Sequence, residues 1–100
     1  MKINITSRKF KAKDSLKDHI YEEVNSLERF SDDIMEANVI LSFTHPKDSI
    51  KEAEINLLMP GQTLTVSDSS EDFHKSITGA VSKLERQLKK VKSKKLAKVR

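Results

Sequence analysis

The sequence contains no cysteine and no tryptophan, and it has two glycines and two prolines among 100 residues. Without cysteine, disulfide bonds and cysteine-ligated metal sites are excluded. No apolar run approaches the roughly 18 residues of a membrane-spanning helix. The N-terminus alternates like a strand and lacks an apolar run followed by a small-residue cleavage site, so we expect no signal peptide. The sequence therefore predicts a cytoplasmic protein without a membrane partner.

Residues that carry catalysis or bind metals are sparse. His19, His45 and His74 lack the spacing of metal ligands, and no HExxH motif is present. Because Gly61 and Gly79 are the only glycines, the sequence has neither a P-loop nor a dinucleotide-binding fingerprint. We therefore expect a protein that is not an enzyme and that has no metal, no cofactor and no small-molecule substrate.

What the sequence has in excess is positive charge near its C-terminus. From Glu71 to Arg100 there are ten Lys or Arg against three acids, a net charge of +7. Residues 1–70 carry nine basic and twelve acidic side chains, a net charge of −3, and the isoelectric point is near 9.4. This polarity predicts one surface that binds a polyanion such as nucleic acid.

One hundred residues, of which 36% are hydrophobic, suit a single domain with a modest two-layer core. Alternation of apolar and polar residues predicts a strand over residues 2–8, and an apolar stripe predicts a helix over residues 14–30. The stripe consists of Leu16, Ile20, Val24 and Leu27. We expect Asp14 or Ser15 to cap this helix, because a short side-chain oxygen can accept a hydrogen bond from an unpaired first-turn N–H.

Three further strands are predicted where alternation returns, over residues 37–44, 53–59 and 63–66. Turn-forming residues separate them at residues 46–49 and at the Pro-Gly pair 60–61, where Pro fixes φ and Gly permits a positive φ. Strands this close in sequence are expected to pair as an antiparallel meander.

A second helix is predicted after these strands, capped by Ser69 or Ser70 and with two acids in its first turn, where the helix dipole favours anions. Its apolar stripe consists of Phe73, Ile77, Ala80, Val81, Leu84, Leu88 and Val91. The stripe fails beyond this point, because Lys95 would lie on it. We therefore expect one domain over residues 1–91 and a basic, flexible tail over residues 92–100.

The predicted order of elements is β-α-β-β-β-α. The first strand, helix and second strand imply a parallel pair joined by a right-handed crossover. Two amphipathic helices and a sheet with one apolar face bury one another if both helices cover that face. The prediction is an α+β two-layer sandwich, a four-stranded sheet with two helices on one face and solvent on the other.

A row of basic residues lies opposite the apolar stripe of the second helix. It consists of Lys75, Arg86 and Lys89, flanked by Lys83 and Lys90. Lysines on a helix surface are often merely solvated, but such surfaces usually mix signs, and this row has Glu85 as its single internal acid. We expect it to neutralise phosphates with release of counterions. If the helices lie side by side, the row is extended by Arg8, Lys9, Lys11 and Lys13.

Aromatic residues, which single-strand binders use to stack on bases, are few. Phe43 and Phe73 fall at core-facing positions. Phe10 and Tyr21 are the remaining candidates for stacking, and packing is the favoured role for both. The sequence therefore favours recognition of folded RNA or DNA through backbone shape and charge.

Four segments resemble one known family. They are Ile3–Arg8 (INITSR), Leu27–Phe30 (LERF), Asp72–Ile77 (DFHKSI) and Lys83–Lys90 (KLERQLKK). From its first residue to about Lys92, the chain is similar to the bacterial hibernation-promoting factor and ribosome-associated inhibitor family, also labelled a sigma-54 modulation family. The KLERQL run in its helical context is the specific part of this resemblance.

The resemblance implies a fold similar to double-stranded-RNA-binding domains. It also implies binding to the small ribosomal subunit and the 70S ribosome, in the channel between head and body. There, family members contact 16S rRNA and block the messenger and transfer RNA sites under stress or in stationary phase. By their positions in the matching motifs, the resemblance implies that rRNA is contacted by Lys83, Arg86, Lys89, Lys90 and Arg29. The charge argument adds Lys75, Lys92 and Arg8.

The sequence departs from the family pattern at several positions. The first helix has Glu23 and Ser26 where members often carry basic residues, which argues against an RNA contact there. His74 replaces a usual Tyr, and Thr78 replaces a common Asp. The chain also lacks the C-terminal dimerisation domain of long members, so we expect a short form that is a monomer off the ribosome.

The leading hypothesis is a ribosome hibernation factor that inhibits translation without catalysis. The alternative, from the older label, is a protein-interaction regulator of a sigma-54 transcription factor. A third hypothesis, a module for free duplex RNA, follows from the analogy of fold alone.

Overall fold

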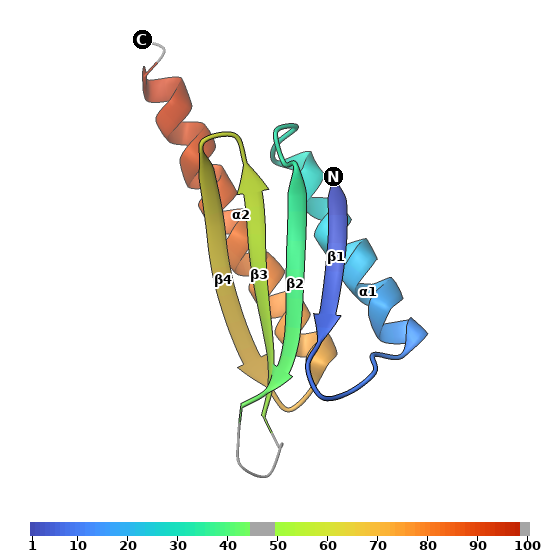
Figure 1. The fold of residues 1–100 in the computed structure, drawn as a ribbon. Coiled ribbons are helices and arrows are strands. Elements are labelled where there is room, and N and C mark those ends of the chain that lie inside the picture. Colours follow the sequence, from blue (N-terminus) through green and yellow to red (C-terminus); the bar gives the residue numbers. More distant parts are fainter. Residues whose placement is uncertain (45–49, 99–100) are drawn as a thin grey trace.

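The computed structural model describes the backbone of residues 1–44 and 50–98 and the side chains of residues 1–44 and 50–91. In chain order the elements are β1 (Lys2–Ser7), α1 (Asp14–Asn25), the short 3-10 helix η1 (Ser26–Arg29), β2 (Glu36–Phe43), β3 (Lys51–Met59), β4 (Gln62–Ser70) and α2 (Phe73–Lys98) (Figure 1). The predicted order and the α+β class are confirmed. The turn predicted at residues 46–49 lies outside the described residues.

The four strands form one sheet in the order β1-β2-β3-β4. β1 pairs with β2 in parallel, and the two later pairs are antiparallel, as predicted. The turn between β3 and β4 depends on Gly61, whose φ of 78° lies in the left-handed region that favours glycine.

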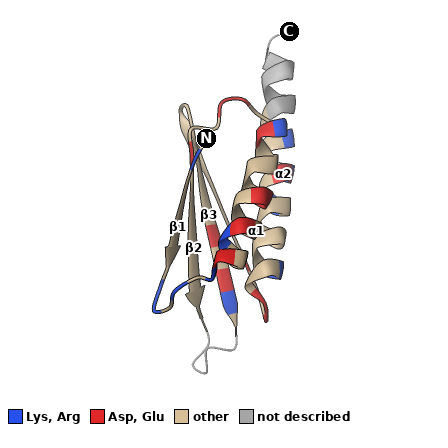
Figure 2. Cartoon of the chain, turned by 90° about the vertical axis from the view of Figure 1, so that its right-hand side faces the viewer, with Lys and Arg blue, Asp and Glu red and all other residues tan. Residues whose placement is uncertain are grey.

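Both helices cover the same face of the sheet, as Figures 1 and 2 show. One row of this face runs through Ile5, Val39, Ile55 and Val66 across all four strands. The helices contribute buried side chains that include Ile20, Leu27, Ile77 and Leu84. Burying each large apolar side chain contributes about 1.5–3 kcal/mol, so this layer is the main source of stability.

The opposite face of the sheet is mainly polar, with Ile40 and Leu58 as its apolar residues on β2 and β3. Asn4, Asn38, Asn56 and Thr65 form a row across its four strands. Asn4 donates to Asn38 over 2.8 Å, and the Thr65 hydroxyl donates to Asn56 over 2.8 Å. The charged side chains at outward positions of this face are Lys2, Glu36, Glu52 and Glu54. This face therefore stays open to water and carries net negative charge.

The start of α1 differs from the prediction. Its N-cap is Lys13, which makes no side-chain capping bond. Asp14 and Ser15 already belong to the helix, so neither can cap it. The helix ends in the tighter turn η1, within the predicted range.

The start of α2 also differs, because β4 is longer than predicted. Ser70 pairs with Lys51 of β3, so Ser69 and Ser70 are strand residues. Asp72 caps the helix instead, and its Oδ1 accepts a hydrogen bond of 2.9 Å from the His74 N–H.

The backbone of α2 continues past the predicted end at residue 91 as far as Lys98. Residues 92–98 contain neither Gly nor Pro and are rich in Lys, Leu and Ala, which are strong helix formers, so nothing local stops the helix. The side chains from Lys92 onward lie outside the described residues. The flexible character of residues 92–100 stays a prediction.

A buried hydroxyl fixes the first turns of α2 to the sheet. Ser76 is 0% exposed, and its Oγ lies 2.7 Å from the carbonyl oxygen of Lys51 and 3.0 Å from the Ser70 hydroxyl. It thereby connects α2 to β3 and β4 at once.

Replacing this hydroxyl should be costly. Ser76→Ala removes a donor from buried polar groups, and we expect it to lower the free energy of unfolding by about 1–3 kcal/mol in urea denaturation. The control is Ser82→Ala on the exposed side of α2, where we expect a change within about 0.5 kcal/mol. Equal effects of the two substitutions would contradict the role given to Ser76.

Candidate nucleic-acid interface

The exposed side of α2 carries a cluster of cations that we call the α2 ridge. It consists of Lys75, Arg86, Lys89 and Lys90 (Figure 2). Their spacing places them on the side of the helix away from the buried stripe. Among residues 1–44 and 50–91 the one ion pair found joins Lys83 to Asp68, so no carboxylate neutralises the ridge.

Lys83 lies at the β4 side of this ridge rather than on it. Its Nζ donates to the Ser67 carbonyl oxygen over 2.6 Å and lies 3.4 Å from Asp68 Oδ1. Gly79 belongs to the same contact, because a Cβ there would overlap the Asp68 carboxylate. Lys83 must leave these partners before it can reach a phosphate.

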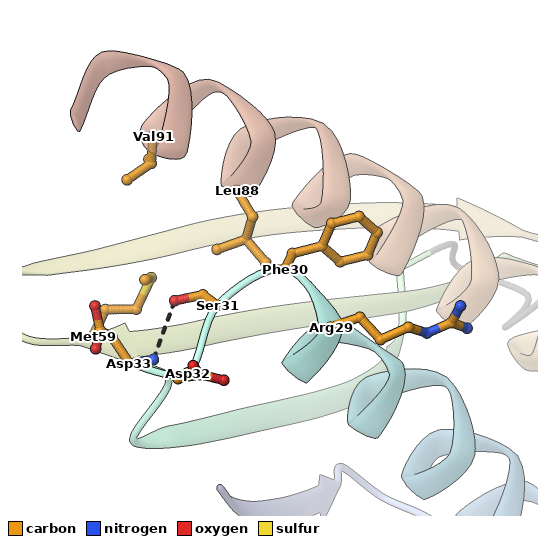
Figure 3. A pocket seen from close by; sticks show the side chains of 8 residues that line it. All are labelled: Arg29, Phe30, Ser31, Asp32, Asp33, Met59, Leu88 and Val91. Carbon is orange, nitrogen blue, oxygen red and sulfur yellow. Dashed lines mark hydrogen bonds between the residues drawn. The ribbon is translucent and has the colours of Figure 1, made fainter. Parts of the chain in front are cut away.

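Arg29 lies near the later turns of α2 (Figure 3). It lines a cavity of about 270 Å³ together with Phe30, Asp32, Asp33 and, from α2, Leu88 and Val91. The Lys89 ammonium lies 5.5 Å from the centre of the Phe30 ring, within the range of a cation–π contact. The structure thus brings Arg29 and Lys89 to one end of the helix pair.

Arg8 is not part of this group. It is exposed after the end of β1 and lines a separate groove with Lys9, Phe43 and Glu52. No α2 residue lines that groove. The side chain of Lys92 lies outside the described residues, so its predicted contact is neither supported nor opposed.

α1 lies beside α2 but does not extend its positive surface. The exposed side of α1 and η1 carries four carboxylates: Asp14, Asp18, Glu22 and Glu28. The basic connection before α1 is therefore a separate positive segment, and the cationic surface between the helices is narrower than predicted.

Three residues that depart from the family pattern, Glu23, His74 and Thr78, lie where α1 packs against α2. We call this contact region the seam. The Thr78 hydroxyl donates to Glu23 Oε1 over 3.0 Å. His19 Nε2 lies 3.2 Å from the His74 carbonyl oxygen and 3.3 Å from Thr78 Oγ1. Glu23, His74 and Thr78 thus take part in contacts within the protein.

The predictions for histidine and aromatic residues have mixed outcomes. His19 and His74 lie at the seam, with ring centroids 4.7 Å apart, and no group of three or more metal-binding side chains occurs in the described part of the chain. His45 lies outside it. Phe10 packs on Phe73, as predicted, with centroids 5.0 Å apart. Tyr21 is 42% exposed, so the prediction that it packs is wrong: it lies on the exposed side of α1.

Fold and surface together define a small α+β domain with a candidate polyanion-binding helix. The family model described as "Sigma 54 modulation protein / S30EA ribosomal protein" matches residues 3–96. The chain belongs to this family. In the described residues, no helix is both long and apolar enough to cross a membrane.

Two curated relatives illustrate the match. The ribosome hibernation promoting factor of Azotobacter vinelandii is 31% identical over 96 residues, which are 96% of this chain and 87% of that protein. The ribosome hibernation promotion factor of Bacillus subtilis is 31% identical over 94 residues. This chain spans 50% of the length of the Bacillus protein.

Solved structures confirm the fold. The N-terminal domain of Protein Y from Thermus thermophilus has a TM-score of 0.80 and 28% identity, covering 91% of this chain and 99% of that domain. A ribosomal subunit interface protein from Coxiella burnetii has a TM-score of 0.81 and 25% identity, covering 93% and 99%. The similarity to double-stranded-RNA-binding domains stays a prediction.

Asp68 within β4 and Asp72 immediately before α2 should differ in their effect on stability. The Lys83–Asp68 pair is 47% and 32% exposed, and such pairs contribute at most about 1 kcal/mol. We therefore expect Asp68→Ala to change the free energy of unfolding by less than that. Asp72→Ala removes the cap of α2 and should cost about 0.5–2 kcal/mol in the same urea titration. A larger loss for Asp68→Ala would show that its pair with Lys83 is structural.

Proposed function

We propose that this protein is a ribosome hibernation factor. It binds the small ribosomal subunit in the decoding channel through 16S rRNA and inhibits translation under stress or in stationary phase. The observation that carries the proposal is the α2 ridge, whose cations are exposed and lack carboxylate partners in the described residues. The names of relatives that match nearly the whole chain support the hibernation role. A ribosome partner also implies a cytoplasmic protein.

The ridge suits a phosphate backbone because it is rigid. From Lys75 to Lys90 the helix rises about 22 Å, and its opposite side is fixed in the core. The backbone that carries the charges is therefore ordered before binding, so the entropy cost of the contact is limited to the rotamer freedom of the Lys and Arg side chains. Arg86 can hold a phosphate with two parallel hydrogen bonds, while the lysines act as point charges.

The remaining predicted contacts form a second group around this ridge. Lys83 reaches RNA once it leaves Asp68, Arg29 adds a contact from the end of η1, and Lys92, the next basic residue after Lys90 in the sequence, is a further predicted contact. Arg8 contacts RNA away from the ridge.

Inhibition requires no catalysis, since a protein in the channel excludes messenger and transfer RNA by its volume. The acidic side of α1 is repelled by phosphate, so α2 faces the RNA.

Reversing two charges of the ridge should abolish ribosome binding. We expect the variant Arg86→Glu with Lys90→Glu to fail to sediment with small ribosomal subunits through a sucrose cushion, because like charges then face the phosphates. The control is Lys2→Glu with Lys17→Glu, which makes the same change in net charge on the outer sheet face and on α1.

Unchanged sedimentation of a folded ridge variant would overturn the proposed site. If a stoichiometric complex with a transcription factor also survived nuclease treatment, the sigma-54 hypothesis would replace it. Loss of binding in both variants would mean that net charge, and not the ridge, decides.

Binding should also weaken with salt in proportion to the phosphates contacted. Each contact contributes roughly 0.7–0.9 to the log–log slope, so the four ridge residues alone predict a slope of about −2.8 to −3.6, and each further proposed contact makes it steeper. Fluorescence anisotropy with labelled protein and small subunits over a potassium chloride series measures it. A slope near zero would exclude phosphate neutralisation as the source of affinity.

A further inference from the structure

A groove lies at the end of the molecule where both helices begin (Figure 1). Its volume is about 350 Å³, within the range of sites that hold small ligands. The apolar part of its lining consists of Phe10, Leu16, Phe43 and Phe73. The remainder of the lining comes from the β1–α1 connection, the start of α1, the first residue of β3, the β4–α2 connection and the first turn of α2.

The aromatic residues that line this groove are held in place by contacts between their rings. The Phe10 ring is nearly parallel to the Phe73 ring, with centroids 5.0 Å apart and an interplanar angle of 11°. Phe43 meets Phe10 edge to face, with centroids 5.1 Å apart. Phe73 is buried, whereas Phe10 is half-buried. The Phe10 ring is therefore fixed by its contacts with two other rings and is still partly exposed to solvent.

The backbone before Phe10 is strained. Lys9 has a φ of 66°, in the left-handed region that non-glycine residues seldom adopt. This conformation is unfavourable for a residue that has a Cβ, and it turns the chain after β1, where Phe10 meets Phe73. Strain of this kind often marks a functional segment.

The rim of the groove is mainly cationic. Lys11 and Lys13 are exposed and have no ion-pair partner in the part of the chain that the structure describes. The Lys51 ammonium is fixed at the rim by a hydrogen bond of 2.9 Å to the Glu71 carbonyl oxygen. Two carboxylates, Glu71 and Asp72, also line the groove, so its lining has three amines against two acids, a net charge of +1. An anionic ligand is therefore favoured.

We propose that this groove receives one unpaired nucleotide of an RNA strand. Its base lies against Phe10, and its phosphates lie near Lys11 and Lys13. An aromatic platform with a cationic rim is the chemistry by which proteins hold single strands. The inference rests on the proposed function, since His74 lines the groove and the next residue, Lys75, begins the α2 ridge. A strand bound along the ridge would have to pass around the first turn of α2 to enter the groove.

Two variants test the groove separately from the fold. Phe10→Leu keeps an apolar side chain but removes the ring. Lys11→Ala with Lys13→Ala removes exposed charges that make no packing contact in the core. The matched charge control is Lys2→Ala with Lys17→Ala. The probes are a short fluorescein-labelled oligoadenylate and a labelled RNA hairpin duplex, measured by anisotropy.

We expect Phe10→Leu to weaken oligoadenylate binding about ten-fold and to change duplex binding less than about two-fold, because stacking needs an unpaired base. The double lysine variant should also weaken oligoadenylate binding more than its control does. Equal losses for oligoadenylate and duplex in Phe10→Leu, or no loss in either groove variant, would overturn the inference.

Nuclear magnetic resonance identifies the occupied site. Aromatic resonances of Phe10, Phe43 and Phe73 should shift with oligoadenylate at concentrations at which adenosine monophosphate leaves them unchanged. Equal shifts with the mononucleotide would overturn the assignment to a strand and indicate a free-nucleotide site. Absent shifts would overturn the site itself.

The two proposals can fail independently. If Arg86→Glu with Lys90→Glu leaves ribosome binding intact while the aromatic shifts persist, the ridge fails as the binding site and the groove stands. If that variant loses ribosome binding while the groove variants behave like their controls, the groove fails and the ridge stands.

Discussion

The burial of one side of α2 against the sheet is the interaction on which the rest of the structure depends. Leu84 and Leu88 are buried, so Arg86 between them must face solvent. Rotation about the helix axis is further restricted at the N-terminal turns, where the Ser76 hydroxyl contacts β3 and β4. The positive surface is therefore a consequence of core packing, because each apolar contact on one side fixes a charge on the other.

The same packing separates charges of opposite sign on adjacent helices. α1 is held beside α2 with its carboxylates outward, and the polar contacts at the seam are made within the protein. Glu23 accepts a hydrogen bond from Thr78 there, so this acid has a partner within the protein. The uninterrupted positive charge therefore lies on α2 and not on both helices.

Periodicity was sufficient to predict the elements, their order and the face that the helices cover, because each apolar stripe must be buried. It was insufficient where a residue has two competing roles. Ser70 is a plausible cap in isolation, but hydrogen bonding to β3 makes it a strand residue. Lys83 has the helical position of a ridge residue, but a carbonyl on β4 attracts its long side chain. Arg8 lies apart from the ridge because its position depends on the path of the chain after β1.

The outer face of the sheet, with three glutamates against one lysine at outward positions, lies behind the layer that carries the cations. Negative charge therefore lies both on this face and on the exposed side of α1, and the positive charge of the described residues is concentrated on α2 and on the β1–α1 connection. Under the proposed function, this uneven distribution favours approaches in which α2 faces the phosphates, because the acidic surfaces are repelled. A larger fraction of diffusional encounters with RNA would then be productive, so the polar face of the sheet would assist association without touching the partner.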